Sequence, residues 1–318
     1  MRCPGLLLAC ALIRTHPSLV AQELLPFSVF NHLPNGEVQI EVANESNGPY
    51  RLEVASALPN WQGWITASGS SPHTDAAAPY LPARFYRAVG LEAGNPITGD
   101  HLPTENGEAV LHPIEHASVV LSWNGLTIYV DAVGSTTLYT GLPGADLILV
   151  THSHGDHYNS STIAAVRNPG APIIAPPEVI NLLSRSLREG AISLSNHGTT
   201  NLLGLTVEAI PAYNSRHPQG AGNSYVLGLG GKRVLFSGDT EDVPEMRALT
   251  GIDVAFLCMN LPFTMSVEAA ASAVRDFQPR VVYPYHYRNQ DGSFANLQSF
   301  KQMVGTDQGV EVRIRDWY

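Results

Sequence analysis

Cysteine is scarce in this sequence. Three of the 318 residues are cysteine, and two of them, Cys3 and Cys10, stand at the amino-terminal end. If that end is removed on export, only Cys258 remains and no internal disulfide can form. Cys258 follows the apolar residues 254–257, where a buried and inert thiol is expected. The folded chain must therefore be stabilised by its core and not by disulfides.

Basic residues and long apolar runs are also few. Lys and Arg number 18 against 28 Asp and Glu, which gives a net charge of −10. No cluster of basic residues is present, and nucleic-acid binding depends on such clusters to neutralise phosphate. No segment after the amino terminus has the ~20 apolar residues that a transmembrane helix needs. Length and a hydrophobic content of 44% instead suit a compact globular protein with room for two domains.

Residues 1–22 are similar to an export signal. A basic start is followed by the apolar residues 3–13 and by small residues at 18–22, which is the order of a cleavable signal. Arg14 interrupts this order, so a misassigned start is the alternative interpretation. We expect an exported protein, either periplasmic or extracellular, and lipidation of Cys10 stays open.

Residues 26–91 contain short runs of alternating hydrophobicity separated by Gly, Pro, Asn and Ser, which predict a small all-β sandwich. The region resembles the immunoglobulin-like modules attached to secreted bacterial proteins. Trp61 and Trp64 are expected in its core; the alternative is a face that contacts a glycan or a protein partner. Residues 92–107 are rich in Gly, Pro, Asn and Thr and predict a linker.

Residues 108–318 alternate strand and helix patterns and predict an α/β domain. Asn124-Gly125 between two apolar runs is typical of a two-residue hairpin turn. Because strands outnumber helices and several are adjacent, two sheets covered by outer helices fit the order better than one doubly wound sheet. The expected strands are 119–123, 126–130, 147–150, 173–175, 205–210, 225–229, 234–237, 254–257, 281–283 and 310–314. The expected helices are 160–166, 178–187, 243–249, 267–277, capped by Ser266, and 294–303.

The most informative stretch is residues 152–157, with the sequence His-Ser-His-Gly-Asp-His. Three imidazoles and a carboxylate fall within six positions of a loop that leaves the apolar strand 147–150. Nitrogen and oxygen donors of this kind are ligands for Zn²⁺ and similar ions. Solvated loop histidines are the alternative interpretation. Only twelve histidines occur in the whole chain, so three in one window indicate a metal site.

Three further candidate ligands, His217, Asp239 and His286, lie within a few positions of the ends of three different predicted strands. In α/β proteins, sites are built on the loops at the carboxyl ends of strands. Strand ends at one edge of a sandwich can converge in space. We therefore predict that these three side chains join the first histidine cluster.

With these residues in this order, the chain from about residue 108 to 318 resembles the metallo-β-lactamase superfamily. Supporting stretches are residues 116–118, 212–214, 217–218, 236–240, 260–265 and 284–287. The resemblance is strongest to the branch containing L-ascorbate-6-phosphate lactonase and N-acyl phosphatidylethanolamine phospholipase D. It implies a four-layer αββα sandwich preceded by the small all-β sandwich module.

The resemblance also implies a binuclear metal site with seven ligands, two metal ions and zinc as the expected metal, with manganese or iron as alternatives. One ion would be held by His152, His154 and His217 and the other by Asp156, His157 and His286, with Asp239 bridging both. True zinc β-lactamases carry a non-bridging residue type in place of Asp239, and the extended insertions of β-CASP nucleases are missing. Hydrolysis of antibiotics or nucleic acids is therefore not expected.

Two cations about 3.5 to 4 Å apart can share a hydroxide whose pKa falls toward neutrality, and can stabilise charge that develops on the substrate. We therefore expect an exported binuclear metallohydrolase that uses a metal-bridging hydroxide to cleave an ester, lactone or phosphodiester bond in a small molecule. Asp156 and Asp239 would belong to its catalytic centre.

Other residues near the candidate ligands have predicted supporting roles. Residues expected to orient the ligands are His116, Asn159 and Thr240, with ordinary turn residues as the alternative. Residues that could deliver a proton to the leaving group are Tyr158 and Tyr287, and their rings could instead only wall the pocket. Residues expected to line the pocket are Tyr213, Phe263 and Met265.

Two other functions remain open at the level of sequence. The same fold can hold two irons for redox chemistry, which generally needs an accompanying flavin domain, and none is visible. A non-catalytic binding protein, attached through the amino-terminal module, is the other alternative, although all seven ligand positions are present.

Overall fold

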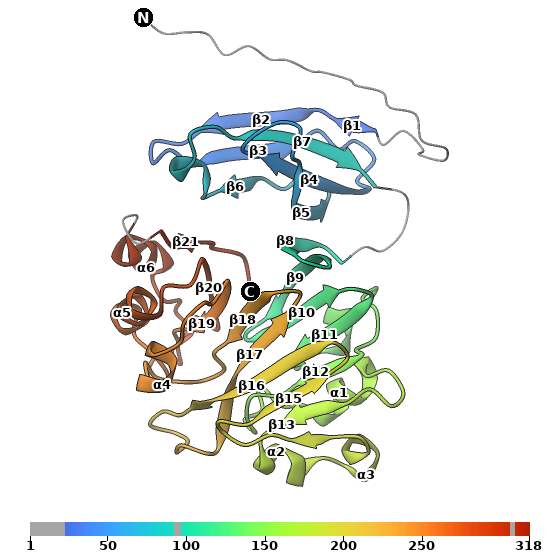
Figure 1. Cartoon of the computed structure of the whole chain (residues 1–318), viewed down its shortest axis with the longest axis vertical. Coiled ribbons are helices and arrows are strands. Elements are labelled where there is room, and N and C mark those ends of the chain that lie inside the picture. Colours follow the sequence, from blue (N-terminus) through green and yellow to red (C-terminus); the bar gives the residue numbers. More distant parts are fainter. Residues whose placement is uncertain (1–22, 92–96, 306–308) are drawn as a thin grey trace, which may run out of the picture.

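The computed structural model describes residues 23–91, 97–305 and 309–318. The predicted export signal, residues 1–22, lies outside the described residues. Figure 1 shows a small β module above a larger α/β body. Within the described ranges, no helix combines the length and the apolar character needed to cross a membrane.

The amino-terminal module consists of strands in two sheets. One is a three-stranded sheet with the order β2-β3-β6, and the other begins with the order β1-β7-β4-β5. The strands are β1 (Leu24–Leu25), β2 (Phe27–His32), β3 (Val38–Val42), β4 (Pro49–Ala55), β5 (Gln62–Ser68), β6 (His73–Asp75) and β7 (Phe85–Gly90). Ile40, Leu52 and Trp64 are buried in the core of the module. The expectation of an all-β sandwich and of a core Trp64 is confirmed, whereas Trp61 is only half-buried beneath the guanidinium of Arg87.

Of the predicted linker, residues 92–107, the part 92–96 lies outside the described residues, and the prediction is wrong for residues 99–104. Strand β8 (Gly99–Thr104) lies there and pairs with β5 on one side and with β9 (Gly107–Glu115) on the other. The composition of this segment is typical of turns and did not indicate a strand. It nevertheless forms one, because its backbone groups pair with both neighbouring strands, and this tertiary pairing outweighs local propensity. Consequently the module and the body share one eleven-stranded sheet.

The body consists of two sheets. The first continues through β9, β10 (Ser118–Trp123), β11 (Leu126–Val130), β12 (Leu147–Leu149), β13 (Ile173–Ala175) and β14 (Ile192–Ser193). The second has the order β15 (Thr199–Leu202), β16 (Leu205–Ala212), β17 (Gly222–Leu229), β18 (Lys232–Phe236), β19 (Val254–Cys258), β20 (Val281–Tyr285) and β21 (Glu311–Val312). The hairpin turn at Asn124-Gly125 is confirmed, since both residues have positive φ, as a primed turn requires.

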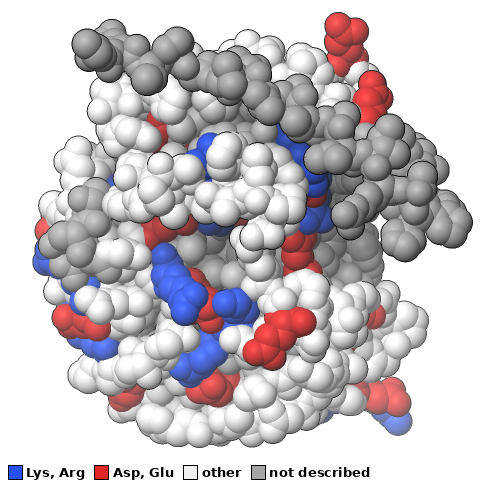
Figure 2. Space-filling model, turned by 45° about the horizontal axis from the view of Figure 1, so that its top comes forward, with Lys and Arg blue, Asp and Glu red and all other residues white. Residues whose placement is uncertain are grey.

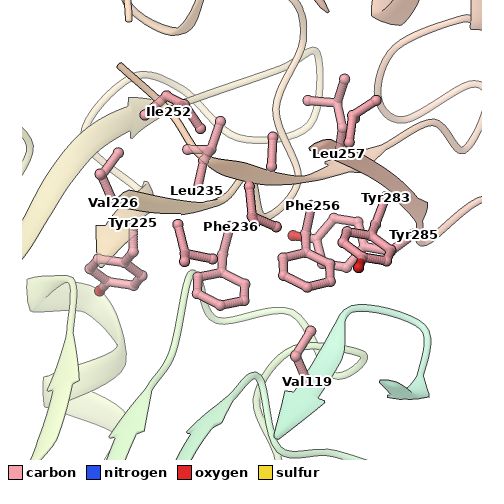
Figure 3. Packing of buried hydrophobic residues seen from close by; sticks show 14 of the residues in the cluster. Val119, Tyr225, Val226, Leu235, Phe236, Ile252, Phe256, Leu257, Tyr283 and Tyr285 are labelled. Carbon is pink, nitrogen blue, oxygen red and sulfur yellow. The ribbon is translucent and has the colours of Figure 1, made fainter. Parts of the chain in front are cut away.

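Alternating side chains of the first sheet face two different layers. Val119 belongs to the core between the sheets, whereas Val120 belongs to a second core under the outer helices. Figure 3 shows Phe236 and Phe256 of the second sheet on the side of Val119, with Ile252 on the opposite side. Helices lie outside both sheets (Figure 1), which gives the four layers of an αββα sandwich.

The outer helices match the prediction at residues 160–166 and 267–277 and are shorter elsewhere. They are α1 (Ser160–Val166), α2 (Pro177–Leu182), α3 (Arg185–Arg188), α4 (Pro244–Arg247), α5 (Val267–Phe277) and α6 (Leu297–Val304), with 3-10 turns η1 (Ala78–Tyr80) and η2 (Thr136–Tyr139). The single predicted helix 178–187 is split, because Leu183 is extended and the Ser184 hydroxyl caps α3 by accepting from Leu187 N. Ser266 caps α5, as predicted.

Cys258, the last residue of β19, is fully buried. Burial raises the pKa of its thiol to about 11, so the thiolate form that reacts is suppressed at neutral pH. The expectation of a buried and inert thiol agrees with this position.

Charged side chains on the face of the body below the module are interleaved by sign. Figure 2 shows Lys and Arg next to Asp and Glu around a hollow, not as a continuous basic surface. Asp253 lies 3.2 Å from the amino group of Lys232 and 3.6 Å from Arg280, and Arg313 pairs with Glu311. In these pairs the positive charge is locally neutralised.

Candidate metal centre

The histidine cluster lies on the loop that follows β12. Thr151 and His152 continue from the strand as buried residues, and the loop then turns so that the backbone N–H of His157 donates to the carbonyl of His154 at 2.9 Å. This turn puts His152, His154 and His157 on one concave side. His154 and Asp156 remain exposed, so the cluster opens to solvent.

The three later candidates join this cluster, as predicted. His217 follows β16, Asp239 follows β18 and His286 follows β20, all at the same edge of the second sheet. Potential ligand atoms lie within 4.8 Å of one another in three overlapping groups, which are His152, His154 and His217; His152, His157 and Asp239; and Asp156, His157 and His286.

The short distances inside the cluster identify Asp239 as its centre. Its Oδ1 lies 3.2 Å from His157 Nε2 and 3.4 Å from His286 Nε2. His286 Nε2 is also 3.4 Å from Asp156 Oδ2, and His152 Nε2 is 3.0 Å from His154 Nδ1. Asp239 therefore lies against two of the candidate ligand imidazoles.

Several buried polar atoms of the cluster have no hydrogen-bond partner among the described residues. They are His157 Nε2, both ring nitrogens of His217 and of His286, and Asp239 Oδ1. Leaving such atoms unpaired in the interior costs about 1–3 kcal/mol each. Divalent cations would satisfy them, because imidazole nitrogen and carboxylate oxygen are their usual ligands. The residues present therefore fit metal ions.

Burial and neighbouring charges together set the protonation of the cluster. Burial lowers the pKa of His152 well below its usual value, which keeps the ring neutral as a ligand must be. Burial alone would raise the pKa of Asp239, but the imidazoles of His286 and His157 outweigh it and hold that pKa well below the usual range. Asp239 is therefore ionised at neutral pH.

Asp131 supports the cluster and was not identified from the sequence. It is fully buried, and its Oδ2 lies 2.7 Å from His157 Nδ1 and accepts from the Thr151 hydroxyl at 2.7 Å. Thr151 Oγ1 in turn lies 3.1 Å from His152 Nδ1. These contacts turn the Nε2 atoms of both histidines toward the centre. The signal was available, because Asp131 directly follows the apolar strand 126–130.

Of the residues predicted to orient ligands, His116 contacts one. Its ring packs 5.4 Å from the His286 ring, and its carbonyl accepts from the His286 backbone N–H at 3.0 Å. Asn159 instead caps α1 through its side-chain oxygen. Thr240 donates to the carbonyl of Glu241 at 2.8 Å, and its hydroxyl contacts none of the metal-ligand side chains. For Asn159 and Thr240 the ordinary turn interpretation fits better.

The tyrosines predicted near the site point their hydroxyls elsewhere. Tyr158 donates to the Leu182 carbonyl at 3.2 Å, Tyr287 to the Arg315 carbonyl at 3.4 Å, and Tyr213 to the Glu245 carboxylate at 3.1 Å. The structure therefore does not support the predicted proton delivery by Tyr158 or Tyr287. Short-range sequence proximity to the ligands was misleading, because adjacent side chains on a loop point in different directions.

The two remaining pocket candidates differ. Met265 is buried and packs in the hydrophobic cluster of the body. Phe263 is half-exposed and packs beneath the guanidinium of Arg216, which precedes the candidate ligand His217.

Comparisons with known proteins agree with this geometry. A family described as the beta-lactamase superfamily domain matches residues 127–287, which include all seven candidate ligands. A UPF0173 metal-dependent hydrolase of Pyrococcus abyssi is 35% identical over 176 residues, covering 52% of this chain and 77% of that protein. A solved structure from Parabacteroides distasonis, assigned as a metal-dependent hydrolase, has 37% identity and a TM-score of 0.62 over 70% of this chain and 100% of that one. Igni18, a metallo hydrolase of Ignicoccus hospitalis, has 25% identity and a TM-score of 0.57 over 65% of this chain and 94% of its own.

Proposed function

The chain belongs to the metallo-β-lactamase superfamily and is a metal-dependent hydrolase, and from this we propose that it cleaves an ester, lactone or phosphodiester bond with two divalent metal ions. The observation that carries the proposal is the convergence of seven donor residues around buried polar atoms that lack protein partners. The two ions, when bound, acidify water and polarise the carbonyl or phosphoryl oxygen under attack.

The candidate ligands can be divided between the two ions according to the groups in which their donor atoms lie. We assign His152, His154 and His217 to one ion, and Asp156, His157 and His286 to the other. Asp239, with its Oδ1 within 3.4 Å of imidazoles of the second group and in one donor group with His152, is assigned to both. Zinc suits this mixture of imidazole and carboxylate donors, and manganese or iron are the alternatives.

Residues behind the ligands fix their orientation. Asp131 accepts the Nδ1–H proton of His157, so the lone pair of Nε2 faces the centre. The Thr151 hydroxyl donates to Asp131 and accepts from His152 Nδ1, which fixes the second ring in the same way. Because His154 and Asp156 are exposed, a small substrate can approach the ligand cluster from solvent.

Metal content and substitution test the proposal. Elemental analysis of the purified protein should find two ions per chain, and hydrolysis should be sought among lactone, ester, phosphodiester and β-lactam substrates. His152→Ala and Asp239→Ala should each abolish the hydrolysis. His197→Asn is the matched control, since His197 is exposed, lies outside the cluster and has a positive φ that Asn tolerates. Turnover by Asp239→Ala at the wild-type rate would contradict the proposal.

A further inference from the structure

Two arginines beside the ligand cluster have no carboxylate partner among the described residues. Arg216 directly precedes His217, and Arg288 follows His286 by two positions. Both are exposed. Arg233, by contrast, pairs with Glu208 at 3.0 Å. These two unpaired charges belong to the segments that carry the candidate ligands His217 and His286.

Each of these guanidinium groups is held by an aromatic ring. Arg216 lies over Phe263, with 5.2 Å from Cζ to the ring centroid, and Arg288 lies over Tyr318 at 4.9 Å. Arg288 also approaches His116 Nε2 at 2.9 Å, and the His116 ring packs against His286. Stacking on a ring leaves the planar edge of guanidinium, with its hydrogen-bond donors, available to a ligand.

The two arginines flank different parts of the cluster. Arg216 belongs to the loop of His217, which groups with His152 and His154, whereas Arg288 is connected through His116 to His286 on the other side. The protein as a whole carries a net charge of −10 and would repel an anion at long range. Unpaired guanidinium groups near the candidate ligands would offset that repulsion locally.

We propose that the substrate carries an oxyanion, a carboxylate or a phosphate, and that Arg216 and Arg288 bind such groups on the two sides of the cluster. This proposal rests on the proposed hydrolytic function, because it names the class of substrate. Guanidinium pairs with carboxylate and phosphate through parallel hydrogen bonds, which fix the orientation of the substrate as well as attract it.

Binding of inert anions tests the arginines without any reaction. Succinate and butyrate have the same chain length, but only succinate keeps a second carboxylate for an arginine once the first has met the metal-loaded centre. Calorimetry should show succinate binding about tenfold more tightly than butyrate, the value of one charge-assisted hydrogen bond. Arg216→Gln and Arg288→Gln should each reduce that preference, and the double variant should abolish it. Arg185→Gln, an exposed arginine on α3, is the matched control and should keep it.

Glutarate and valerate repeat the comparison with one more methylene, so the result does not depend on one ligand length. Equal binding of the paired ligands by the wild type overturns the proposal. A preference left unchanged by one glutamine substitution overturns the role of that arginine. Two ions per chain in every variant shows that the loss is not caused by displacement of His286 through His116.

Hydrolysis of a matched pair of esters separates this proposal from the proposed function. For 4-nitrophenyl hydrogen succinate, KM in the Arg216→Gln and Arg288→Gln variants should rise about tenfold relative to KM for its neutral methyl ester. Arg288→Lys should recover part of the difference because it keeps the charge. If succinate is preferred but no substrate is hydrolysed, the proposed hydrolytic function is wrong and the arginine site stands. If substrates are hydrolysed but succinate is not preferred, the arginine site is wrong and the hydrolytic function stands.

Discussion

Asp131 is a single residue whose side chain contacts both Thr151 and His157 of the ligand loop. Its fully buried carboxylate accepts from Thr151 N of the loop backbone at 2.7 Å and contacts the Nδ1 atom of His157. It also has a positive φ of 46°, a conformation that an Asp tolerates better than most residues. One side chain therefore holds the start of the ligand loop and the tautomer of a ligand.

Replacing Asp131 with Asn should weaken metal binding about 10- to 100-fold, because the amide keeps the shape but loses the negative charge that orients His157. Competition with a chelator of known affinity measures this change. Asp291→Asn is the control, because Asp291 is exposed and bonds only within its own turn. Equal metal affinity of the Asp131→Asn variant and the wild type would show that the contact is not needed.

His73 in the amino-terminal module should make stability depend on pH. Burial, with the nearby Arg315 charge, lowers the pKa of His73 to about 4, and its ring nitrogen contacts the Tyr50 hydroxyl at 2.7 Å. Between pH 6.5 and 4 the unfolded chain binds the proton and the folded one does not, so stability falls as pH falls. In urea unfolding, His73→Gln should reduce this slope by up to about 1.4 kcal/mol per pH unit. An unchanged slope would contradict the assignment.

At the scale of elements, α5 depends on its cap. The Ser266 hydroxyl accepts from Ala269 N at 3.2 Å at the start of the helix, whose inner face packs in the core. Ser266→Ala should cost about 1 kcal/mol of unfolding free energy. Urea unfolding measures it against Ser70→Ala, an exposed loop serine expected within about 0.5 kcal/mol of the wild type. A loss no larger than that of the control would refute the cap.

Elements with a strong local signal could be predicted from the sequence. A few adjacent residues were enough to indicate several elements. These are the Asn124-Gly125 turn, the core strands 147–150 and 254–257 and the cap at Ser266. Strand β8 could not be predicted, because its stability comes from β5 and β9 on its two sides and not from its own composition. Short strands β14 and β15 were missed for the same reason.

In the candidate site, too, some features could be predicted from the sequence and others could not. The candidate ligands could be predicted because each follows a buried strand. The loops that leave strands at the same edge of a sheet lie close together, so side chains on these loops can converge. Roles that depend on side-chain direction were not predictable: the hydroxyls of Tyr158 and Tyr287 turn toward backbone carbonyls, and Met265 turns into the core. Arg216 and Arg288 belong to no sequence motif. They are distinguished only in the structure, where each stacks on an aromatic ring and has no carboxylate partner among the described residues.

At the scale of the whole molecule, an ion pair joins distant parts of the chain. Arg315, near β21, donates two hydrogen bonds of 2.9 Å to the buried Asp100 on β8. Lys301 on α6 also pairs with Glu37 of the module. The Lys301 pair and the β5–β8 ladder fix the module to the body, and the Arg315 pair ties the segment after β21 to β8.

Arg315→Gln should therefore destabilise the protein by about 3–5 kcal/mol, because it leaves the Asp100 carboxylate buried without its partner. Thermal or urea unfolding measures the loss. Arg280→Gln, whose side chain is 77% exposed and 3.6 Å from Asp253, should cost less than about 1 kcal/mol and serves as the control. Similar small losses in both variants would show that the Asp100 pair does not hold the parts together.

The strand shared by module and body also bears on how the protein can be dissected. Cutting the chain at residue 92 would look like a clean separation of two domains, yet it would strip β8 of its neighbour β5. The freed backbone groups would form an unprotected edge, and such edges recruit strands from other molecules. A catalytic fragment prepared in this way should self-associate, so the shortest well-behaved version of this hydrolase retains its amino-terminal sandwich.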